Sequence, residues 1–600
     1  MWRRSYLLLL LVRIYFAISP SYLHPDENFQ GPEVIADELF LYPSNRTWEW
    51  TSNYPIRSVF PLWPVYGIPM TLLKWVWAQD DQQNLSPKAI YYLLRVVMFI
   101  LSFVLEDWAI YELVHAPRHR RQAVILVASS YVTWTYQSHT FSNSIETLLV
   151  TWSLVLIERI VREKNSSSML TCSILSLIIV FGIFNRITFP AFILIPGLQL
   201  LPHFLARPFS FLVTVASAVV FTCLAIGTDT AFFRLRDLNT SSTTFFRTLV
   251  TNPVITPWNN IRYNTQTSNL ALHGLHPRYQ HFLVNLPQLL GPALILLLTS
   301  LPALSLLNLR LRFSNPCLLS AITGTAFLSI FPHQEPRFLL PCVPLLLTCI
   351  HLPTSSRGRK WFWSSWLVFN ILLGILMGVY HQGGVIPAQL QVPDLLRSSI
   401  SSPPPTNTTA MIPATIFWWK TYPPPTYLLG NTAPFNISTV PLMGLSQPDM
   451  LEQVTAALPF PCSSPPPPPP LTTRDAIQNN QPVFLTAPLS SPLFPPSSAS
   501  TPNASFLAHA RLPSNNKAHS SAEQEEEKDQ GRGEGEDDNN TPLELALMWT
   551  YRQHINLDDM DIASDVWGTL RRVVGGRGIG VWRVERRCPP GSGVESIILA

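Results

Sequence analysis

Charged side chains are scarce in this sequence. They make up 13% of the 600 residues, against about 25% in ordinary soluble proteins. A soluble chain of this length could not cover its surface with so few charges. The 41 Lys and Arg nearly balance the 37 Asp and Glu, and no long basic block occurs, so nucleic acid is excluded as a partner. The composition indicates a membrane protein.

Cysteine is also rare. Seven cysteines in 600 residues exclude a disulfide-rich scaffold, and no CxxC or Cys/His pair has the spacing of a metal site. His273, His276 and His281 lie close together in the sequence but lack the HExxH pattern of a zinc site. The sequence therefore predicts neither a metal nor a bound cofactor.

Long apolar stretches fill the first 380 residues instead. Eleven of them are long enough, or nearly so, to cross a hydrocarbon core of about 30 Å as a helix. They lie at about 5–19, 89–113, 123–137, 144–160, 169–185, 187–206, 209–227, 286–308, 316–332, 337–353 and 361–380. A twelfth apolar segment, 58–78, carries three prolines and Lys74, which favours a helix lying in the membrane interface. The fold predicted is an all-α membrane protein with about eleven spans.

The short loops show which way the spans face. With the N-terminus in the cytoplasm, alternate loops hold thirteen Lys and Arg, whereas the short loops on the other side hold only Arg186. Basic residues mark the cytoplasmic side. Residues 20–88, 228–285 and the tail from 381 would then be lumenal. The sequons at Asn45, Asn239, Asn407, Asn436, Asn503 and Asn539 all fall in these segments, and only the sequon at Asn165 falls in a cytoplasmic loop.

The chain changes character after residue 380, and half of its 56 prolines fall in the last third. Residues 1–380 are predicted to form the membrane domain. Residues 381–462 hold aromatic clusters such as Phe417-Trp418-Trp419, which favour a lumenal segment packed on that domain. Residues 463–540 combine a proline tract with Ser/Asn-rich and acidic sequence, so we expect a disordered insert. Residues 541–600 form a further lumenal segment.

The first candidate site follows the first span, at His24-Pro25-Asp26-Glu27. Two adjacent carboxylates at a membrane surface could provide a catalytic base. They could equally mark a helix start, because proline and acidic residues are both favoured in the first turn. The two interpretations are compatible.

Two more polar clusters lie on the predicted lumenal side. His333-Gln334-Glu335-Pro336-Arg337 is compressed between two spans, where charges are costly and often functional. An internal salt bridge closing the hairpin is the alternative. The loop 228–285 holds the third cluster, which is typical of a polyol or phosphate site. Its polar members are Arg262, Tyr263, Asn264, Asn269, His273, His276, Arg278, His281 and Asn285.

These segments carry a resemblance to a known family. HPDENFQ, YNTQTSNLALHGLHPRYQHFLVNLP, HQEPRFLLP and FNILLGILMGVYHQGGVIP occur here in this order. Together they resemble the glycosylphosphatidylinositol (GPI) mannosyltransferases of glycosyltransferase family 22, which have the GT-C membrane fold. The HGLHPR loop and Phe417–Gly430 are most similar to the branch that adds the fourth mannose. The resemblance covers about 1–460 and resumes near 541–587.

The resemblance implies an enzyme of the endoplasmic reticulum membrane that acts on the lumenal side. It would transfer mannose from dolichyl-phosphate-mannose to a GPI precursor, forming an α-1,2 linkage to the third mannose. Because the donor is a β-mannosyl phosphate, an α product requires inversion. Phosphate is already a good leaving group, so a single carboxylate acting as base on the acceptor hydroxyl would suffice.

Asp26 is the first candidate for this base, and Glu27 is the alternative. Cations must meet the charge that develops on the departing phosphate. The residues expected to bind substrate or phosphate are His24, Arg186, His276, Arg278, His333, Glu335 and Arg337. Two other functions stay open: another family 22 mannosyltransferase, acting on the third GPI mannose or an N-glycan precursor, and a transporter of lipid-linked sugars.

Overall fold

The structure, a computed structural model, describes residues 2–77, 85–163, 166–235, 242–271, 274–300, 315–399, 411–458, 481–491, 493, 505–511, 540–557 and 566–586. The chain divides into two compact units. The first comprises 1–19, 23–379 and 425–428, and the second comprises 20–22, 380–424 and 429–600.

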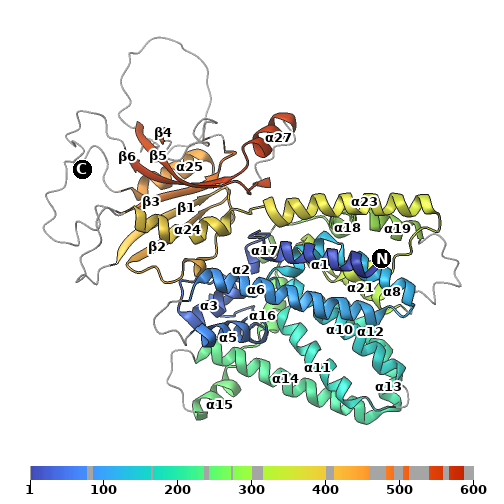
Figure 1. The fold of residues 1–600 in the computed structure, drawn as a ribbon. Helices are drawn as coiled ribbons and strands as arrows, with labels where there is room; N and C mark the ends of the chain where they lie inside the picture. The colour runs from blue at the N-terminus through green and yellow to red at the C-terminus, as the bar shows by residue number, and fades with distance from the viewer. Residues whose placement is uncertain are drawn as a thin grey trace, which may run out of the picture. The chain divides into compact units, whose positions relative to one another are not determined.

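The first unit is built of helices (Figure 1). Its N-terminal half contains α1 (Trp2–Ile18), α2 (Asp26–Phe29), α3 (Pro32–Phe40), α4 (Trp48–Thr51), α5 (Ile68–Trp77), α6 (Pro87–Leu101), α7 (Asp107–Leu113), α8 (Pro117–Ala128), α9 (Tyr131–Trp134), α10 (Ser142–Arg162) and α11 (Met169–Asn185). The rest contains α12 (Pro190–Gly197), α13 (Leu201–Ala206), α14 (Pro208–Arg234), α15 (Ser242–Thr251), α16 (Thr256–Asn264), α17 (Thr267–Ala271), α18 (Leu286–Leu290), α19 (Pro292–Ser300), α21 (Pro316–Leu328), α22 (Cys342–Thr348) and α23 (Ser356–Ile375).

Each of the eleven predicted spans contains helix in its described part. Within the part of the chain that the structure describes, three helical stretches, Pro87–Leu113, Pro208–Arg234 and Ser356–Tyr380, are long and apolar enough to cross a membrane, and a pair bent by 117° at Gly291 would make a fourth. The count of eleven therefore stays a prediction. Three predicted spans are interrupted: 123–137 breaks at Ser129–Ser130, 286–308 bends at Gly291, and 337–353 is divided between a short 3-10 helix, Pro336–Leu339, and the seven-residue α22. Pro341 accounts for the break in 337–353, because it precedes α22 and has no backbone N–H to continue the preceding 3-10 helix.

The predicted interfacial segment 58–78 is helical from Trp63 to Trp77. Its position at a membrane surface stays a prediction. Elsewhere in the first unit, small hydroxyl residues let α11 and α14 approach closely. Ser176 donates to the carbonyl of Thr214 at 2.8 Å, and Ser217 and Ser173 share a hydrogen bond of 2.9 Å. Such contacts are a common way to join helices in a membrane.

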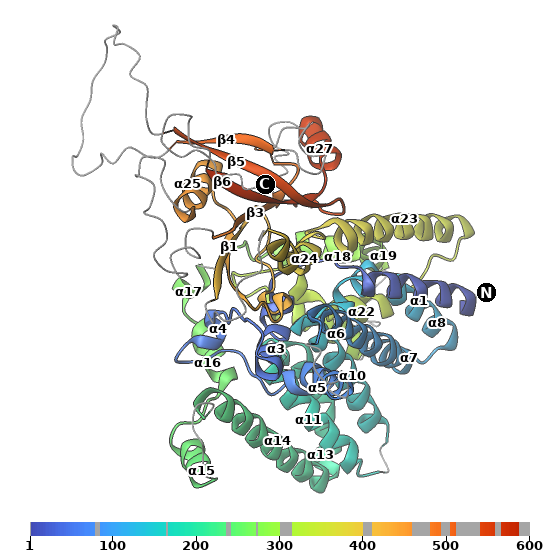
Figure 2. The same cartoon turned by 60° about the vertical axis from the view of Figure 1, so that its left-hand side comes forward.

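The second unit contains a six-stranded sheet in the order β2-β1-β3-β6-β5-β4 (Figure 1), and Figure 2 shows β1, β3, β4, β5 and β6 from another side. The strands are β1 (Ile412–Trp419), β2 (Phe435–Leu442), β3 (Val483–Pro488), β4 (Ser505–Arg511), β5 (Asn540–Tyr551) and β6 (Ile579–Arg586). β1 pairs with β2 and β3 in parallel, and the remaining pairs are antiparallel. The unit also contains α24 (Val385–Ser398), α25 (Gln447–Ala457) and α27 (Val566–Gly575).

This sheet corrects three predictions. The fold is not all-α, the segments 381–462 and 541–600 share one sheet, and 463–540 is not wholly disordered because β3 and β4 lie within it. The physical reason is local: five of the six residues of the β3 sequence VFLTAP are apolar, and all six are buried. Because low-complexity sequence surrounds β3, the sequence analysis did not predict this short strand.

The aromatic cluster at 417–419 belongs to the core of this second unit. Phe417 and Trp419 pack there with Met450 and Val454 of α25 and with Trp582 of β6. Burial of such large side chains stabilises the sheet by about 1.5–3 kcal/mol for each residue. The predicted packing of 381–462 on the membrane domain stays a prediction.

Candidate active site

The candidate site begins at α2. This helix starts at Asp26, directly after Pro25, and places Asp26 and Glu27 in its first turn. The interpretation of this motif as a helix start is therefore confirmed. The two adjacent carboxylates point to different surroundings, and their chemistry differs accordingly.

Asp26 keeps access to solvent and is held by two donors. Its Oδ2 accepts from Arg337 Nη1 at 2.6 Å and from Gln30 Nε2 at 2.5 Å, and 26% of its side chain is exposed. His24 Nδ1 lies 3.5 Å from Oδ1. Burial raises the pKa of Asp26, but Arg337, His24 and Arg57 together outweigh it and hold the pKa well below its usual range. Asp26 is therefore ionised at neutral pH.

Arg337 joins the second predicted cluster to the first. Its guanidinium contacts Asp26, which lies 311 residues earlier in the chain, and it also donates to Glu335. Glu335 in turn accepts from His333 Nε2 at 2.9 Å. The internal salt bridge proposed as the alternative for this hairpin is thus present, and the same arginine also reaches the candidate base.

Two shifted pKa values follow from these contacts. Burial raises the pKa of Glu335, but Arg337 and His333 outweigh it and lower the pKa below its usual range. Burial lowers the pKa of His333, but the hydrogen bond and charge of Glu335 outweigh it and raise the pKa above 6.5. His333 therefore keeps its positive charge to a higher pH than a free imidazole does.

Glu27 is enclosed. Only 2% of its side chain is exposed, and its Oε2 lies 2.5 Å from Nδ1 of the buried His139. Burial raises the pKa of Glu27 to about 8 and lowers the pKa of His139. The raised pKa favours the neutral form of Glu27, which shares one hydrogen bond with the His139 ring. This geometry favours a structural role for Glu27, which anchors α2 to the segment before α10.

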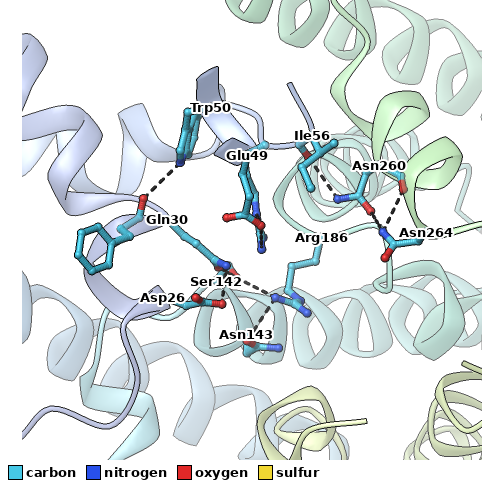
Figure 3. Close-up of polar contacts among 12 residues, drawn as sticks. Asp26, Gln30, Glu49, Trp50, Ile56, Ser142, Asn143, Arg186, Asn260 and Asn264 are labelled. Carbon is cyan, nitrogen blue, oxygen red and sulfur yellow. Dashed lines mark hydrogen bonds and ion pairs between the residues drawn. The ribbon is translucent and has the colours of Figure 1, made fainter. Parts of the chain in front are cut away.

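Arg186 lies in the same region as Asp26 and Gln30 (Figure 3). It contacts Glu146 Oε2 at 3.2 Å, Ser142 Oγ at 3.0 Å and Asn143 Oδ1 at 3.3 Å. Burial lowers its pKa to about 10, which leaves it charged at neutral pH. The guanidinium groups of Arg186 and Arg337 lie 5.3 and 5.6 Å from the centre of the same ring, that of Phe338.

The predicted loop residues His276 and Arg278 are placed differently. The His276 backbone N–H donates to the carbonyl of Pro332 at 2.7 Å, and its ring lies 6.0 Å from that of His333. His276 thus adjoins the second cluster. The Arg278 side chain is exposed, and only its carbonyl is seen to contact that cluster, accepting from Gln334 at 3.4 Å.

Several residues of the site carried no sequence signal of function. They are Gln30, Glu33, Glu49, Arg57, His139, Ser142, Asn143 and Glu146. Gln30 lies four residues after Asp26, one helical turn away, so its spacing could have indicated it. Glu33 accepts from Asn45 N at 2.8 Å and from both the backbone N–H and the hydroxyl of Thr426. No sequence pattern predicts the contact between Glu33 and Thr426, which lie far apart in the chain.

The site contains cations, carboxylates and amides, and no metal site was recognised in it. Across the described ranges, no three His, Cys, Asp or Glu side chains are placed to hold a metal ion. Of the predicted sequons, Asn45 and Asn436 are exposed. Asn239, Asn407, Asn503, Asn539 and Asn165 lie outside the described residues.

Comparison with known proteins identifies the family. Residues 4–429 match the Alg9-like mannosyltransferase family, so the chain belongs to that family. All the candidate site residues fall within this range. The predicted resemblance to the family 22 mannosyltransferases is thereby confirmed.

The chain is also similar to individual members. A protein of Aspergillus oryzae named GPI mannosyltransferase 4 is 50% identical over 597 residues, which cover 98% of this chain and 99% of the relative. A protein of the same name from Emericella nidulans is 48% identical over 98% of this chain. One from Saccharomyces cerevisiae is 38% identical over 70% of this chain. The solved structure of ArnT from Cupriavidus metallidurans bound to undecaprenyl phosphate covers 81% of this chain and 92% of its own, with a TM-score of 0.45 and 12% identity.

Proposed function

We propose that this protein transfers mannose from dolichyl-phosphate-mannose to a GPI-anchor precursor. The mannose added would be the fourth, joined by an α-1,2 linkage to the third, and the reaction would take place at the lumenal face of the endoplasmic reticulum membrane. The names of the relatives support the acceptor. The observation that carries the chemistry is the half-buried, ionised Asp26, held between Arg337 and Gln30.

Asp26 acts as the general base on the attacking hydroxyl of the acceptor. The O–H proton moves to a carboxylate oxygen while the new C–O bond forms on the face opposite the phosphate, which inverts the anomeric carbon. A free Asp26 with a low pKa is a weak base. When the donor phosphate also binds Arg337, that guanidinium shares its charge, so the pKa of Asp26 rises and the carboxylate becomes a better proton acceptor.

The leaving dolichyl phosphate takes up the electron pair of the broken bond. Arg337, Arg186 and His333 are the cations available to it, and the Phe338 ring lies beside both arginines. Preorganised cations of this kind stabilise the charge as it develops. This scheme requires no general acid.

The proposal is tested by complementation. The protein is expressed in a cell that lacks the enzyme for the fourth mannose, and the accumulating GPI precursors are sized by mass spectrometry. Gain of one hexose, released by an α-1,2-mannosidase, is the expected result. Rescue of a third-mannose or N-glycan mutant instead would favour the corresponding sibling activity. Isolated membranes supplied with purified dolichyl-phosphate-mannose identify the donor directly.

A further inference from the structure

Next to Asp26, a second group of polar and aromatic residues is built from α4, the segment after it, and α16. The helix α4 is tied to α2 because Trp50 Nε1 donates to the carbonyl of Phe29 at 3.2 Å. The helix α16 is tied to the same region, because Asn259 and Asn260 donate to the carbonyls of Pro55 and Ile56 at 3.0 and 3.2 Å. Segments about 200 residues apart in the sequence are thus held in fixed register.

Two oxygen atoms in this group accept no hydrogen bond from any described residue. Nε and Nη2 of Arg57 both contact Glu49 Oε1, at 3.0 and 2.9 Å, so Glu49 Oε2 receives no hydrogen bond from Arg57. The Glu49 side chain is 14% exposed. Asn264 uses its Nδ2 to donate to Asn260 Oδ1 at 2.7 Å and to the Asn260 carbonyl, so its own Oδ1 is left over. A partly enclosed acceptor without a hydrogen bond favours a ligand that brings hydrogen-bond donors, because the new bond offsets the cost of removing the acceptor from water.

An aromatic pair belongs to the same two helices, because Trp48 precedes Glu49 in α4 and Tyr263 precedes Asn264 in α16. The rings of Trp48 and Tyr263 are 4.6 Å apart and inclined by 31°, and Trp48 is 41% exposed. A large, partly exposed ring offers apolar contact area. A sugar ring needs this combination, because it has hydroxyl groups at its edge and C–H groups on its faces.

The group is close to the reaction centre. Figure 3 shows Glu49, Asn260 and Asn264 in the same close-up as Asp26, Gln30 and Arg186. Burial raises the pKa of Asp26, and Arg57 is one of the cations that lower it. A ligand on this group would therefore lie in the same region of the protein as the base.

We infer that Trp48, Glu49, Tyr263 and Asn264 form a subsite for the mannose residues of the acceptor glycan. The inference rests on the proposed function and names the part of the protein that would hold the acceptor. A phosphate group fits poorly, because a carboxylate and an amide oxygen would face its negative charge. A chain of neutral sugars bound here places its terminal hydroxyl toward Asp26.

The test separates acceptor binding from donor binding by steady-state kinetics in membranes. Trp48→Ala and Asn264→Leu should each raise the KM for the acceptor about tenfold, which corresponds to one lost contact. The KM for dolichyl-phosphate-mannose and kcat should stay within twofold of wild type, and Trp48→Phe should restore most of the affinity. The matched control is Trp75→Ala, because Trp75 is 65% exposed on α5 outside this group.

A second measurement avoids dependence on the lipid acceptor. A soluble α-linked trimannoside should inhibit the wild type competitively with the acceptor and should inhibit the Asn264→Leu variant about tenfold more weakly. Unchanged acceptor KM in correctly inserted variants, or an equal rise in the KM of both substrates, would overturn the subsite. Failure of the wild type to transfer mannose to the GPI precursor would instead overturn the proposed function.

Discussion

Asp26 and Glu27 show how strongly position within one helical turn decides the chemistry of a side chain. Asp26 is charged and accessible, whereas Glu27 is neutral and enclosed by His139. The sequence offered both as candidate bases and could not rank them firmly. The geometry favours Asp26, because a base must reach the substrate hydroxyl and must be deprotonated to accept its proton.

Replacing each carboxylate by its amide should therefore have unequal effects. Asp26→Asn should lower the rate of mannose transfer by about 10²–10⁴-fold, the usual contribution of a general base. Glu27→Gln should cost less than tenfold, because the amide N–H can still donate to His139. Initial rates in membranes, normalised to the amount of inserted protein, measure both. Equal losses, or near-normal transfer by Asp26→Asn, would contradict the assignment.

Arg337 connects the base to the second cluster, so its substitution should affect both stability and donor binding. Arg337→Ala leaves Asp26 and Glu335 without their shared cation, and loss of one partner from a buried ion pair costs about 3–5 kcal/mol. Arg337→Lys keeps the charge without the planar fork and should retain partial activity with a raised donor KM. Thermal stability in detergent and donor KM together distinguish the variants. Wild-type values for both would leave Arg337 with no role beyond the hairpin.

His333 predicts a pH dependence. Because its pKa is raised above 6.5, the imidazolium persists to a higher pH than in the unfolded chain and is lost as pH rises through the folded-state value. Its contribution to donor binding and to stability is therefore complete at low pH and disappears at alkaline pH. The value of kcat/KM for the donor should fall on that alkaline limb. His333→Gln should flatten this limb, and an unchanged profile would show that another group titrates.

At the scale of the elements, the sequence predicted the helices better than the strands. Apolar runs of fifteen or more residues are strong local signals, and helix lies in the described part of each. The strands are short, and their partners are distant: Leu485 of β3 pairs with Trp582 of β6. The two charged motifs of the site, at 24–27 and 333–337, could also be identified from the sequence. Their meeting at Arg337 and Asp26 was not, because that contact depends on the packing of helices far apart in the chain.

The strand β3 should be essential to the second unit. It lies between β1 and β6, so removing Val483–Pro488 divides the sheet in two. A single change, Leu485→Asp, places a charge at a fully buried position and should also destabilise the unit. Deleting 466–478 is the control, because shortening a connection alters closure entropy by only about 0.6 kcal/mol per halving of its length. Limited proteolysis and protein level in membranes report the outcome.

At the scale of the whole molecule, the family and the apolar helices agree with a membrane enzyme. The side on which Asp26 acts depends on the distribution of basic residues between alternate loops. The same orientation exposes the first loop, 20–88, to the lumen. Asn45 and Asp26 both belong to that loop, so a glycan on Asn45 would report the side that the base faces.

Glycan mapping therefore tests the orientation and the location of the chemistry together. Asn45 is exposed, and we expect it to accept a glycan, whereas Asn165 should stay unmodified because its loop is predicted to be cytoplasmic. Glycosidase treatment should shift the mobility of the wild type by more than that of Asn45→Gln, and Asn165→Gln should match the wild type. Asn436, exposed in β2, gives an independent report on the second unit. A glycan at Asn165 with none at Asn45 would invert the orientation, and Asp26 would then face the cytoplasm, where a lumenal donor could not reach it.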